Sequence, residues 1–339
     1  MLNEAKLDDL LSRPSDGLAE DIKGLDGGDI LVIGAGGKMG PSLCVLASRA
    51  IAQAGMGGKV IAVSRFTDSG SRGYLEANGV ECVNADLLDP AQVNALPDAK
   101  YIIYMAGKKF GTSGAEHMTW AMNTIVPMRV AECYLGSRIV VFSSGNVYPM
   151  TPVVHGGATE ETLPSPVGEY AMSCLGRERV FDYYSRQHGL ECLFFRLNYA
   201  LDLRYGVLHD IAKTIWDGEL VSLSPTAFNC IWQRDANEIA LRCLTRCSAP
   251  PAVYNVTGPE TASVKQTALL LATLLGKEAS FTGEENPDAL LNNAGKSHAE
   301  FGYPSVPLDT LIRWQAEWIL TGGSSLGKPT HFEERKGDF

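Results

Sequence analysis

The feature that most constrains the fold is an alternation of short apolar runs with helix-period segments between residues 30 and 196. Each run is short and mostly apolar, which is typical of a strand buried on both faces. Because strands joined by helical crossovers lie parallel, six such runs predict an α/β fold built on a doubly wound parallel sheet. The predicted strands cover residues 30–33, 59–63, 80–83, 101–105, 138–142 and 192–196.

The domain organisation follows from where this alternation stops. We expect an N-terminal helical extension over residues 1–28, with a helix over 2–13, and the sheet domain over 29–197. A smaller, mainly helical lobe over 198–339 should then close a cleft at the carboxyl edge of the sheet, with its tail from 322 wrapping the surface. Its predicted helices cover residues 207–217, 235–247, 263–275, 287–300 and 307–320.

Charge and composition exclude several classes of function. The 339 residues include 39 acidic and 29 basic side chains, for a net charge of −10, and show no basic stripe. We therefore expect no nucleic-acid partner. No stretch approaches the roughly 18 apolar residues of a membrane span, and charges interrupt the N-terminus where a signal peptide would be apolar, so we expect a cytoplasmic protein. The eight cysteines and six histidines lack ligand spacing, and we expect no metal.

A glycine-rich turn follows the first predicted strand and opens a helix. It places Gly34, Gly37 and Gly40 at intervals of three, with Lys38 and Met39 between the last two. Glycines permit a tight turn and let a pyrophosphate approach the backbone N–H groups at a positive helix end. The position of this turn after the first strand predicts a dinucleotide-binding site.

The glycine spacing resembles the fingerprint of the short-chain dehydrogenase/reductase superfamily, in its extended branch of nucleotide-sugar epimerases and dehydratases. This resemblance implies a Rossmann domain, a nicotinamide cofactor and a carbohydrate-type substrate. Further family positions follow the next strands in order. The resemblance assigns cofactor contacts to Asp86 and Leu87 after the third strand, and to Ala106, Gly107 and Lys109 after the fourth.

The catalytic positions implied by the resemblance come later in the chain. Asn123 matches a structural asparagine, and Ser144 matches the serine that holds the substrate oxygen. Tyr170 matches the tyrosine of the Tyr-x-x-x-Lys motif, which also contacts the cofactor, and Cys174 stands at the lysine position. Asn198 follows the sixth strand, where we expect another cofactor contact. Relatives also pair through a helix matching residues 119–135, which implies a homodimer.

The end of the second strand bears on the choice of cofactor. An acidic residue there would accept hydrogen bonds from the ribose 2′-hydroxyl and repel a 2′-phosphate. The chain instead has Ser64 and Arg65. Because a guanidinium suits a phosphate, the sequence favours NADP over NAD.

The cysteine at position 174 is the main departure from the family. A thiol supplies neither the positive charge of the lysine nor its hydrogen bonds to the ribose, so Tyr170 should ionise less readily. Arg177, one helical turn beyond Cys174, could supply charge from the same helix face. Lys108 or Lys109 could supply it from the opposite loop, or the charge is simply lost.

Two functions remain open at this point. In the first, Ser144 orients a carbohydrate oxygen and Tyr170 acts as acid or base in an NAD(P)-dependent oxidation, epimerisation or dehydration. In the second, the fold binds the dinucleotide as a catalytically weakened sensor or regulator. Retention of the Ser–Tyr pair favours the enzyme, whereas the missing lysine favours the sensor.

The smaller lobe should select the substrate. Arg204, Trp232 and Arg234 are the candidate substrate contacts, because relatives use arginines and aromatic residues in this region. The family's Arg-Pro-x-Asn-Val run is not matched, since Leu197 replaces the proline. A smaller sugar or sugar acid is therefore as compatible with the sequence as a nucleotide sugar.

Overall fold

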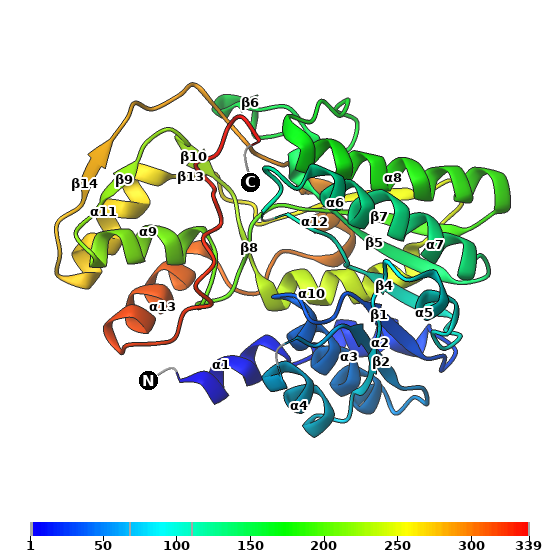
Figure 1. Ribbon diagram of the computed structural model, residues 1–339. Coiled ribbons are helices and arrows are strands. Elements are labelled where there is room, and N and C mark those ends of the chain that lie inside the picture. Colours follow the sequence, from blue (N-terminus) through cyan, green and yellow to red (C-terminus); the bar gives the residue numbers. More distant parts are fainter. Residues whose placement is uncertain (1–2, 68, 110, 338–339) are drawn as a thin grey trace.

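A seven-stranded parallel sheet forms the centre of the computed structural model, which describes residues 3–67, 69–109 and 111–337 (Figure 1). The strand order is β12-β7-β5-β4-β1-β2-β3, and every neighbouring pair is parallel. The strands are β1 (Ile30–Ile33), β2 (Val60–Ser64), β3 (Glu81–Asn84), β4 (Tyr101–Tyr104), β5 (Arg138–Ser144), β7 (Glu191–Leu197) and β12 (Ala252–Val256).

The six predicted strands are confirmed, and the sheet gains a seventh. Strand β12 pairs in parallel with β7, from Ala252 opposite Leu193 to Val256 opposite Leu197. These residues fall within the mainly helical lobe predicted over 198–339, for which no strand of the central sheet was predicted. The sheet therefore draws a strand from beyond the predicted boundary at residue 197, because β7 would otherwise be an unpaired edge.

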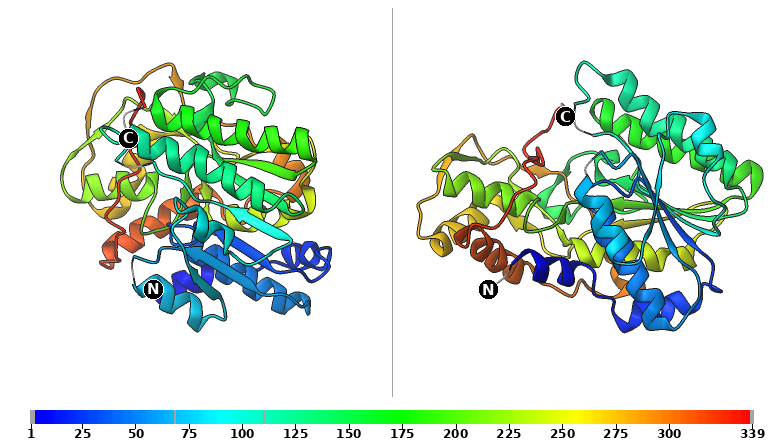
Figure 2. Two further views of the ribbon diagram at one scale, coloured as in Figure 1. Left: turned by 45° about the vertical axis from the view of Figure 1, so that its right-hand side comes forward. Right: turned by 60° about the horizontal axis from the view of Figure 1, so that its bottom comes forward.

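Alternating side chains on each strand face two different helical layers. Ile30 and Val32 pack with α2 (Asp16–Lys23), α3 (Gly40–Ala54) and α10 (Gln233–Arg242). Leu31 and Ile33 point to the opposite face, where they share a core with α7 (Val126–Cys133) and α8 (Gly168–His188). Figure 2 shows these helices on the two faces of the twisted sheet. This is the predicted doubly wound arrangement.

The smaller lobe has its own apolar core beside the carboxyl edge of the sheet. Helices α9 (Val207–Trp216), α11 (Val264–Leu275) and α13 (Leu308–Leu320) pack around the buried Trp318. Helix α1 (Glu4–Leu11) adds Leu7 and Leu11 to this core. The N-terminal extension therefore connects the sheet domain with the smaller lobe. The predicted lobe helix at 235–247 corresponds to α10, which packs on the sheet instead.

One predicted helix is mostly wrong. Of residues 287–300, only the part within α12 (Gly295–Phe301) is helical. Asp288 and Ala289 form β15, which pairs antiparallel with β6 (Thr151–Pro152). Leu291 and Asn293 then form backbone hydrogen bonds with Ala158 at 2.8 Å, so pairing with a distant segment holds this stretch extended.

The remaining elements are short. The helices are α4 (Ser69–Ala77), α5 (Pro90–Asn94), α6 (Glu116–Trp120), the π-helix η1 (Ala121–Ile125) and the 3₁₀ turns η2 (Gly145–Val147), η3 (Val153–His155) and η4 (Cys243–Arg246). The paired strands are β8 (Ala200–Leu201) with β11 (Ile231–Trp232), β9 (Leu220–Ser222) with β14 (Ser280–Thr282), and β10 (Ala227–Phe228) with β13 (Ala262–Ser263). Among the described helices, none has both the length and the apolar character needed to cross a membrane.

Candidate functional site

The glycine turn between β1 and α3 is built so that only glycine fits at two of its positions. Gly34 has φ +96°, and a Cβ on it would lie 2.5 Å from the backbone nitrogen of Ala106. A Cβ on Gly40 would collide with the carbonyl oxygen of Ala35. The turn therefore packs directly against the end of β4 and against its own start, leaving its backbone N–H groups at the N-terminus of α3.

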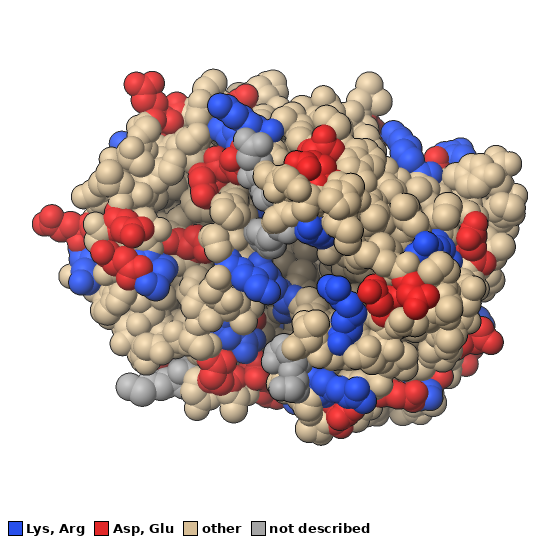
Figure 3. Space-filling view, in the orientation of Figure 1, with Lys and Arg blue, Asp and Glu red and all other residues tan. Residues whose placement is uncertain are grey.

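A cleft of about 340 Å³ opens over this turn, at the carboxyl ends of β1, β4, β5 and β7. In Figure 3 the hollow at the centre of the molecule has Lys and Arg side chains beside it. The structure brings eleven of the residues singled out from the sequence into the lining: Gly34, Gly37, Lys38, Met39, Gly107, Lys108, Lys109, Ser144, Tyr170, Arg177 and Asn198. The lining also includes Tyr199 and Tyr205, which the sequence analysis did not assign.

The predicted catalytic pair meets within this cleft. Ser144 and Tyr170 both line it, and the Ser144 hydroxyl and the Cys174 thiol lie close enough to Tyr170 to influence its pKa. Ser144 ends β5 and also accepts a hydrogen bond from the backbone N–H of Asn146 at 3.1 Å. Burial raises the pKa of Tyr170 well above its usual range, the Cys174 thiol raises it further, and the charge of Arg177 partly offsets this. Tyr170 is therefore a protonated phenol at neutral pH.

Arg177 is a buried residue at the base of the cleft, with 6% of its surface exposed. It donates from Nη1 to the carbonyl oxygen of Phe142 at 2.7 Å, and from Nη2 to Oδ1 of Asn123 at 2.7 Å. A Cβ on Gly107 would lie 2.5 Å from Nη2, so the glycine leaves room for the guanidinium. Arg177 therefore places a buried positive charge on the helix that carries Tyr170, which is one of the alternatives left open by the sequence.

Asn123 ties three parts of the site together. It is fully buried within the π-helix η1, a feature that often occurs at functional sites. Its side chain accepts from the N–H of Lys108 and donates to the carbonyl oxygen of the same residue, at 3.0 and 3.1 Å. It also donates to Oγ of Ser173 at 2.9 Å. Asn123 thus holds the loop after β4 against α8.

Two lysines of the cleft have unusual environments. Nζ of Lys38 lies 3.2 Å from the ring centroid of Tyr205, and burial, with the nearby charges of Lys109 and Lys328, lowers the pKa of Lys38 to about 7. Nζ of Lys109 lies 5.7 Å from the ring centroid of Tyr170, and burial lowers its pKa to about 8. Lowered pKa values of this kind are found where amines serve binding or chemistry.

Other predicted cofactor residues lie beside the turn rather than in the cleft. Ser64 packs against Gly36, where a Cβ would collide with its hydroxyl, and Arg65 follows as an exposed residue. Asp86 and Leu87 follow β3, and Oδ1 of Asp86 accepts from the N–H of Leu88 at 3.0 Å. These positions border the sheet edge on the β2–β3 side, where the far end of a dinucleotide is expected.

The structure does not bring the three predicted substrate contacts to the cleft. Arg204 pairs with Asp202, Asp8 and Glu4, and so anchors α1 to the lobe. Arg234 donates to the carbonyl oxygen of Arg13 and pairs with Asp235 and Glu238. Trp232 is 2% exposed and packs edge-on against Trp314. Asp202, Asp235 and Glu238 are close in sequence to their arginines, but Glu4, Asp8, Arg13 and Trp314 lie far away, and no local pattern reveals those contacts.

A buried ion pair between Arg196 and Glu178, near Ser144, was not predicted from the sequence. Nη2 of Arg196 lies 2.6 Å from Oε2 of Glu178, with the two side chains 6% and 1% exposed. Oε1 of Glu178 accepts from Oγ of Ser143 at 2.6 Å, and Nη1 of Arg196 donates to the hydroxyl of Tyr148 at 2.6 Å. This network fixes the end of β5 against α8.

Within the described residues, no cluster of His, Cys, Asp and Glu could hold a metal ion.

The family follows from a comparison with known sequence families. Residues 30–200 match the model of the NAD dependent epimerase/dehydratase family, which covers half of the chain. The chain belongs to this family of enzymes. No curated protein matches the chain by sequence.

Solved structures show the same fold over almost the whole chain. A dTDP-glucose 4,6-dehydratase from Streptomyces venezuelae superposes with a TM-score of 0.73 at 20% identity, covering 86% of this chain and 97% of its own. A UDP-glucuronic acid 4-epimerase from Bacillus cereus gives 0.71 at 18% identity, with 86% and 99% covered. A UDP-glucose 4-epimerase from Thermotoga maritima gives 0.70 at 18% identity, with 87% and 99% covered. The first two were crystallised with NAD.

Proposed function

We propose that this family member is a working NAD(P)-dependent enzyme that oxidises or reduces one carbon of a carbohydrate or sugar derivative. The observation that carries the proposal is that Ser144 and Tyr170 line the same cleft as the glycine turn, with the buried Cys174 thiol beside Tyr170. A protein that only bound the dinucleotide would have no need to align a serine and a tyrosine there. Oxidation at one carbon is either the whole reaction or a step towards epimerisation or dehydration.

The residues of the cleft fit a dinucleotide. The cradle at Gly34 and Gly40 excludes a side chain, and the N-terminus of the 15-residue helix α3 attracts the pyrophosphate, with Lys38 beside it. Lys109 and Asn198 would contact the other end of the cofactor. A nicotinamide supplies hydride acceptance and donation when bound.

Two side chains of the protein bind the substrate oxygen and transfer its proton. Ser144 holds the substrate oxygen by a hydrogen bond, and Tyr170 gives or takes the proton at that oxygen. Because burial keeps Tyr170 protonated, it can donate directly to a carbonyl, whereas taking a proton from an alcohol depends on nearby positive charge such as that of Arg177. Arg177 replaces the charge of the missing lysine from beneath the cleft, without its direct reach to a ribose.

The finer choice of cofactor rests on Arg65. An exposed guanidinium beside the uncharged Ser64 suits a 2′-phosphate, and we propose NADP on this ground. The similar dehydratase and epimerase crystallised with NAD give no support to this preference. Fluorescence titration with NADPH and NADH tests it. NADPH should bind at least ten times more tightly, and Arg65→Ala should remove that difference; equal affinities in the unmodified protein would refute it.

We also propose a homodimer built on the exposed face of α6, η1 and α7. Met118, Ile125 and Met128 are each more than a third exposed there, although large apolar residues are usually covered. A second copy would bury them. Light scattering after gel filtration should give twice the chain mass, and Met128→Glu should give monomers. A cytoplasmic location stays a prediction from the sequence.

The experiment that tests the function is a screen of sugars and sugar acids with NAD⁺ and NADP⁺, read by the absorbance of the reduced nicotinamide. Turnover that falls 10²–10⁴-fold in Tyr170→Phe is expected. Tyr183→Phe on the exposed side of the same helix is the matched control and should turn over normally. Dinucleotide binding without turnover on any sugar would favour the alternative, a sensor weakened by Cys174.

A further inference from the structure

The C-terminal segment crosses the molecule between its two parts. It leaves α13 after Leu320 and runs, in red in Figure 1, past β8 towards β6 and the start of α8. Residues 328–337 of this segment are here called the strap. The predicted tail does wrap the surface, and its path takes it to the cleft.

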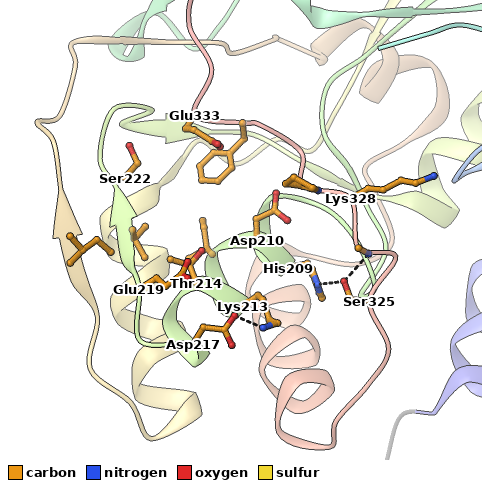
Figure 4. Close-up of a pocket in the computed structure, with 16 residues that line it drawn as sticks. His209, Asp210, Lys213, Thr214, Asp217, Glu219, Ser222, Ser325, Lys328 and Glu333 are labelled. Carbon is orange, nitrogen blue, oxygen red and sulfur yellow. Dashed lines mark hydrogen bonds and ion pairs between the residues drawn. The ribbon is translucent and has the colours of Figure 1, made fainter. Parts of the chain in front are cut away.

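The first half of the strap is held by hydrogen bonds to α9 of the smaller lobe and to Lys109 of the sheet domain. Thr330 is 2% exposed, and its N–H and hydroxyl donate to Oδ2 of Asp210 on α9, at 2.8 and 2.6 Å. Its carbonyl oxygen accepts from Nζ of Lys109 at 3.2 Å. In Figure 4, Asp210 and Glu333 lie on the lobe side, whereas Lys328 points away from them. The strap therefore separates the cleft from the hollow of about 420 Å³ beside α9.

The second half is fixed beside the catalytic helix. The guanidinium of Arg335 donates to the carbonyl oxygen of Asp288 at 3.1 Å and pairs with its carboxylate. The backbone at Gly337 lies against Gly168, where a Cβ would come within 2.6 Å of the Gly337 Cα. Gly168 begins α8, two residues before Tyr170.

The strap fills the outward extension of the cleft. Asn146 lines both the cleft and a space of about 30 Å³ against Arg335 and Gly337. Tyr199 lines both the cleft and a space of about 10 Å³ against Phe332. A water molecule needs roughly 10–15 Å³ of such volume, so these spaces hold only a few waters.

The space that remains limits the size of the substrate. The cleft of about 340 Å³ is near the lower end of the range of about 300–1,000 Å³ that holds one drug-sized ligand. It must take the nicotinamide end of the cofactor as well as the substrate. A nucleotide attached to the sugar would need space beyond the cleft, and beside Lys109, Asn146 and Tyr199 the strap occupies that space.

We propose that the strap closes the outer end of the cleft and restricts the substrate to a free carbohydrate of about monosaccharide size. This inference rests on the proposed function, since it concerns the substrate of the same site. It distinguishes the chain from the similar epimerases and dehydratase, whose names specify UDP- or dTDP-linked sugars.

Hydrogen–deuterium exchange tests the closure of the strap. In the full-length protein the amides of Thr330 and Phe332, which both donate hydrogen bonds, should exchange at least tenfold more slowly than in an unstructured peptide. Asp210→Asn removes an acceptor charge and should speed their exchange at least tenfold. Asp217→Asn, at an exposed ion pair in the same lobe, is the matched control and should leave it unchanged. If the strap amides exchanged as fast as in an unstructured peptide, or if Asp210→Asn did not change their exchange, the proposal that Asp210 holds the strap in place would be overturned.

Calorimetric titration with UDP tests the substrate class. The full-length protein, saturated with NADH so that the glycine turn is occupied, should show no UDP binding at 1 mM. Binding of UDP with a Kd below 1 mM would overturn the proposal, whether or not the strap moves. A failure of the proposed function would appear differently, as a lack of NADH binding or of sugar turnover, while strap protection and UDP exclusion would be unaffected.

Discussion

Replacing Gly34 by alanine should damage both the fold and the cofactor site. The added methyl group would lie 2.5 Å from the backbone nitrogen and 2.6 Å from the Cα of Ala106, and the residue would have to keep φ +96°. Backbone strain of about 1–3 kcal/mol and overpacking of about 1–3 kcal/mol give a total of about 2–6 kcal/mol. This is a large part of the 5–15 kcal/mol that stabilises a typical protein.

Urea denaturation followed by far-UV circular dichroism measures this loss, and NADH fluorescence titration measures the site. Gly37→Ala is the informative comparison, because its methyl group would meet only the Gly34 carbonyl oxygen at 3.5 Å. It should keep the stability within about 0.5 kcal/mol but weaken NADH binding at least tenfold. Gly73→Ala in α4, with no neighbour within 4 Å, should change neither property adversely. If Gly34→Ala were as stable as the unmodified protein and bound NADH equally well, the packing argument would be refuted.

Three other predictions follow from the same structure. Arg196→Met leaves the carboxylate of Glu178 buried without its cation, so the free energy of unfolding measured in urea should fall by about 3–5 kcal/mol. Arg313→Met, at an exposed pair, should lower it by at most about 1 kcal/mol. Equal losses would contradict the buried network. Tyr170→Phe should bind NADH within threefold of the unmodified protein, since the main action of the hydroxyl is on the substrate. Loss of NADH binding would show instead that the hydroxyl mainly holds the cofactor. The pKa of Lys38 is lowered to about 7, so its charge is present below that pH and lost above it, and the Kd for NADH should rise between pH 6 and 8. Lys38→Met should reduce this rise, and the remainder belongs to Lys109, whose pKa is lowered to about 8. An unchanged slope would exclude Lys38.

The parts of the site that local sequence determines could be predicted. The turn at Gly34 to Gly40 depends on glycines at fixed spacing after a strand, and Ser144 and Tyr170 follow strand and helix positions in order. The parallel sheet makes their convergence a consequence of topology, since all the strands end at the same edge. Sequence reasoning therefore recovered most of the inner cleft.

The parts set by distant contacts could not be predicted. Arg204 looked available for a substrate, but its carboxylate partners Glu4 and Asp8 arrive from the other end of the chain. Lys109 meets Thr330 across 221 positions, and no periodicity in the polar tail indicates that contact. The strand at 252–256 was visible as a short apolar run, but its place in the sheet depends on the exposed edge of β7.

The most direct test of the central claim is fluorescence titration of the full-length protein with NADH and NADPH. The structure predicts saturable binding of at least one of them with a Kd below 100 μM, and competition by the oxidised form of the same cofactor. If neither dinucleotide bound at 1 mM, the glycine turn and the cleft above it would not be a cofactor site, and the proposed chemistry of Ser144 and Tyr170 would be contradicted.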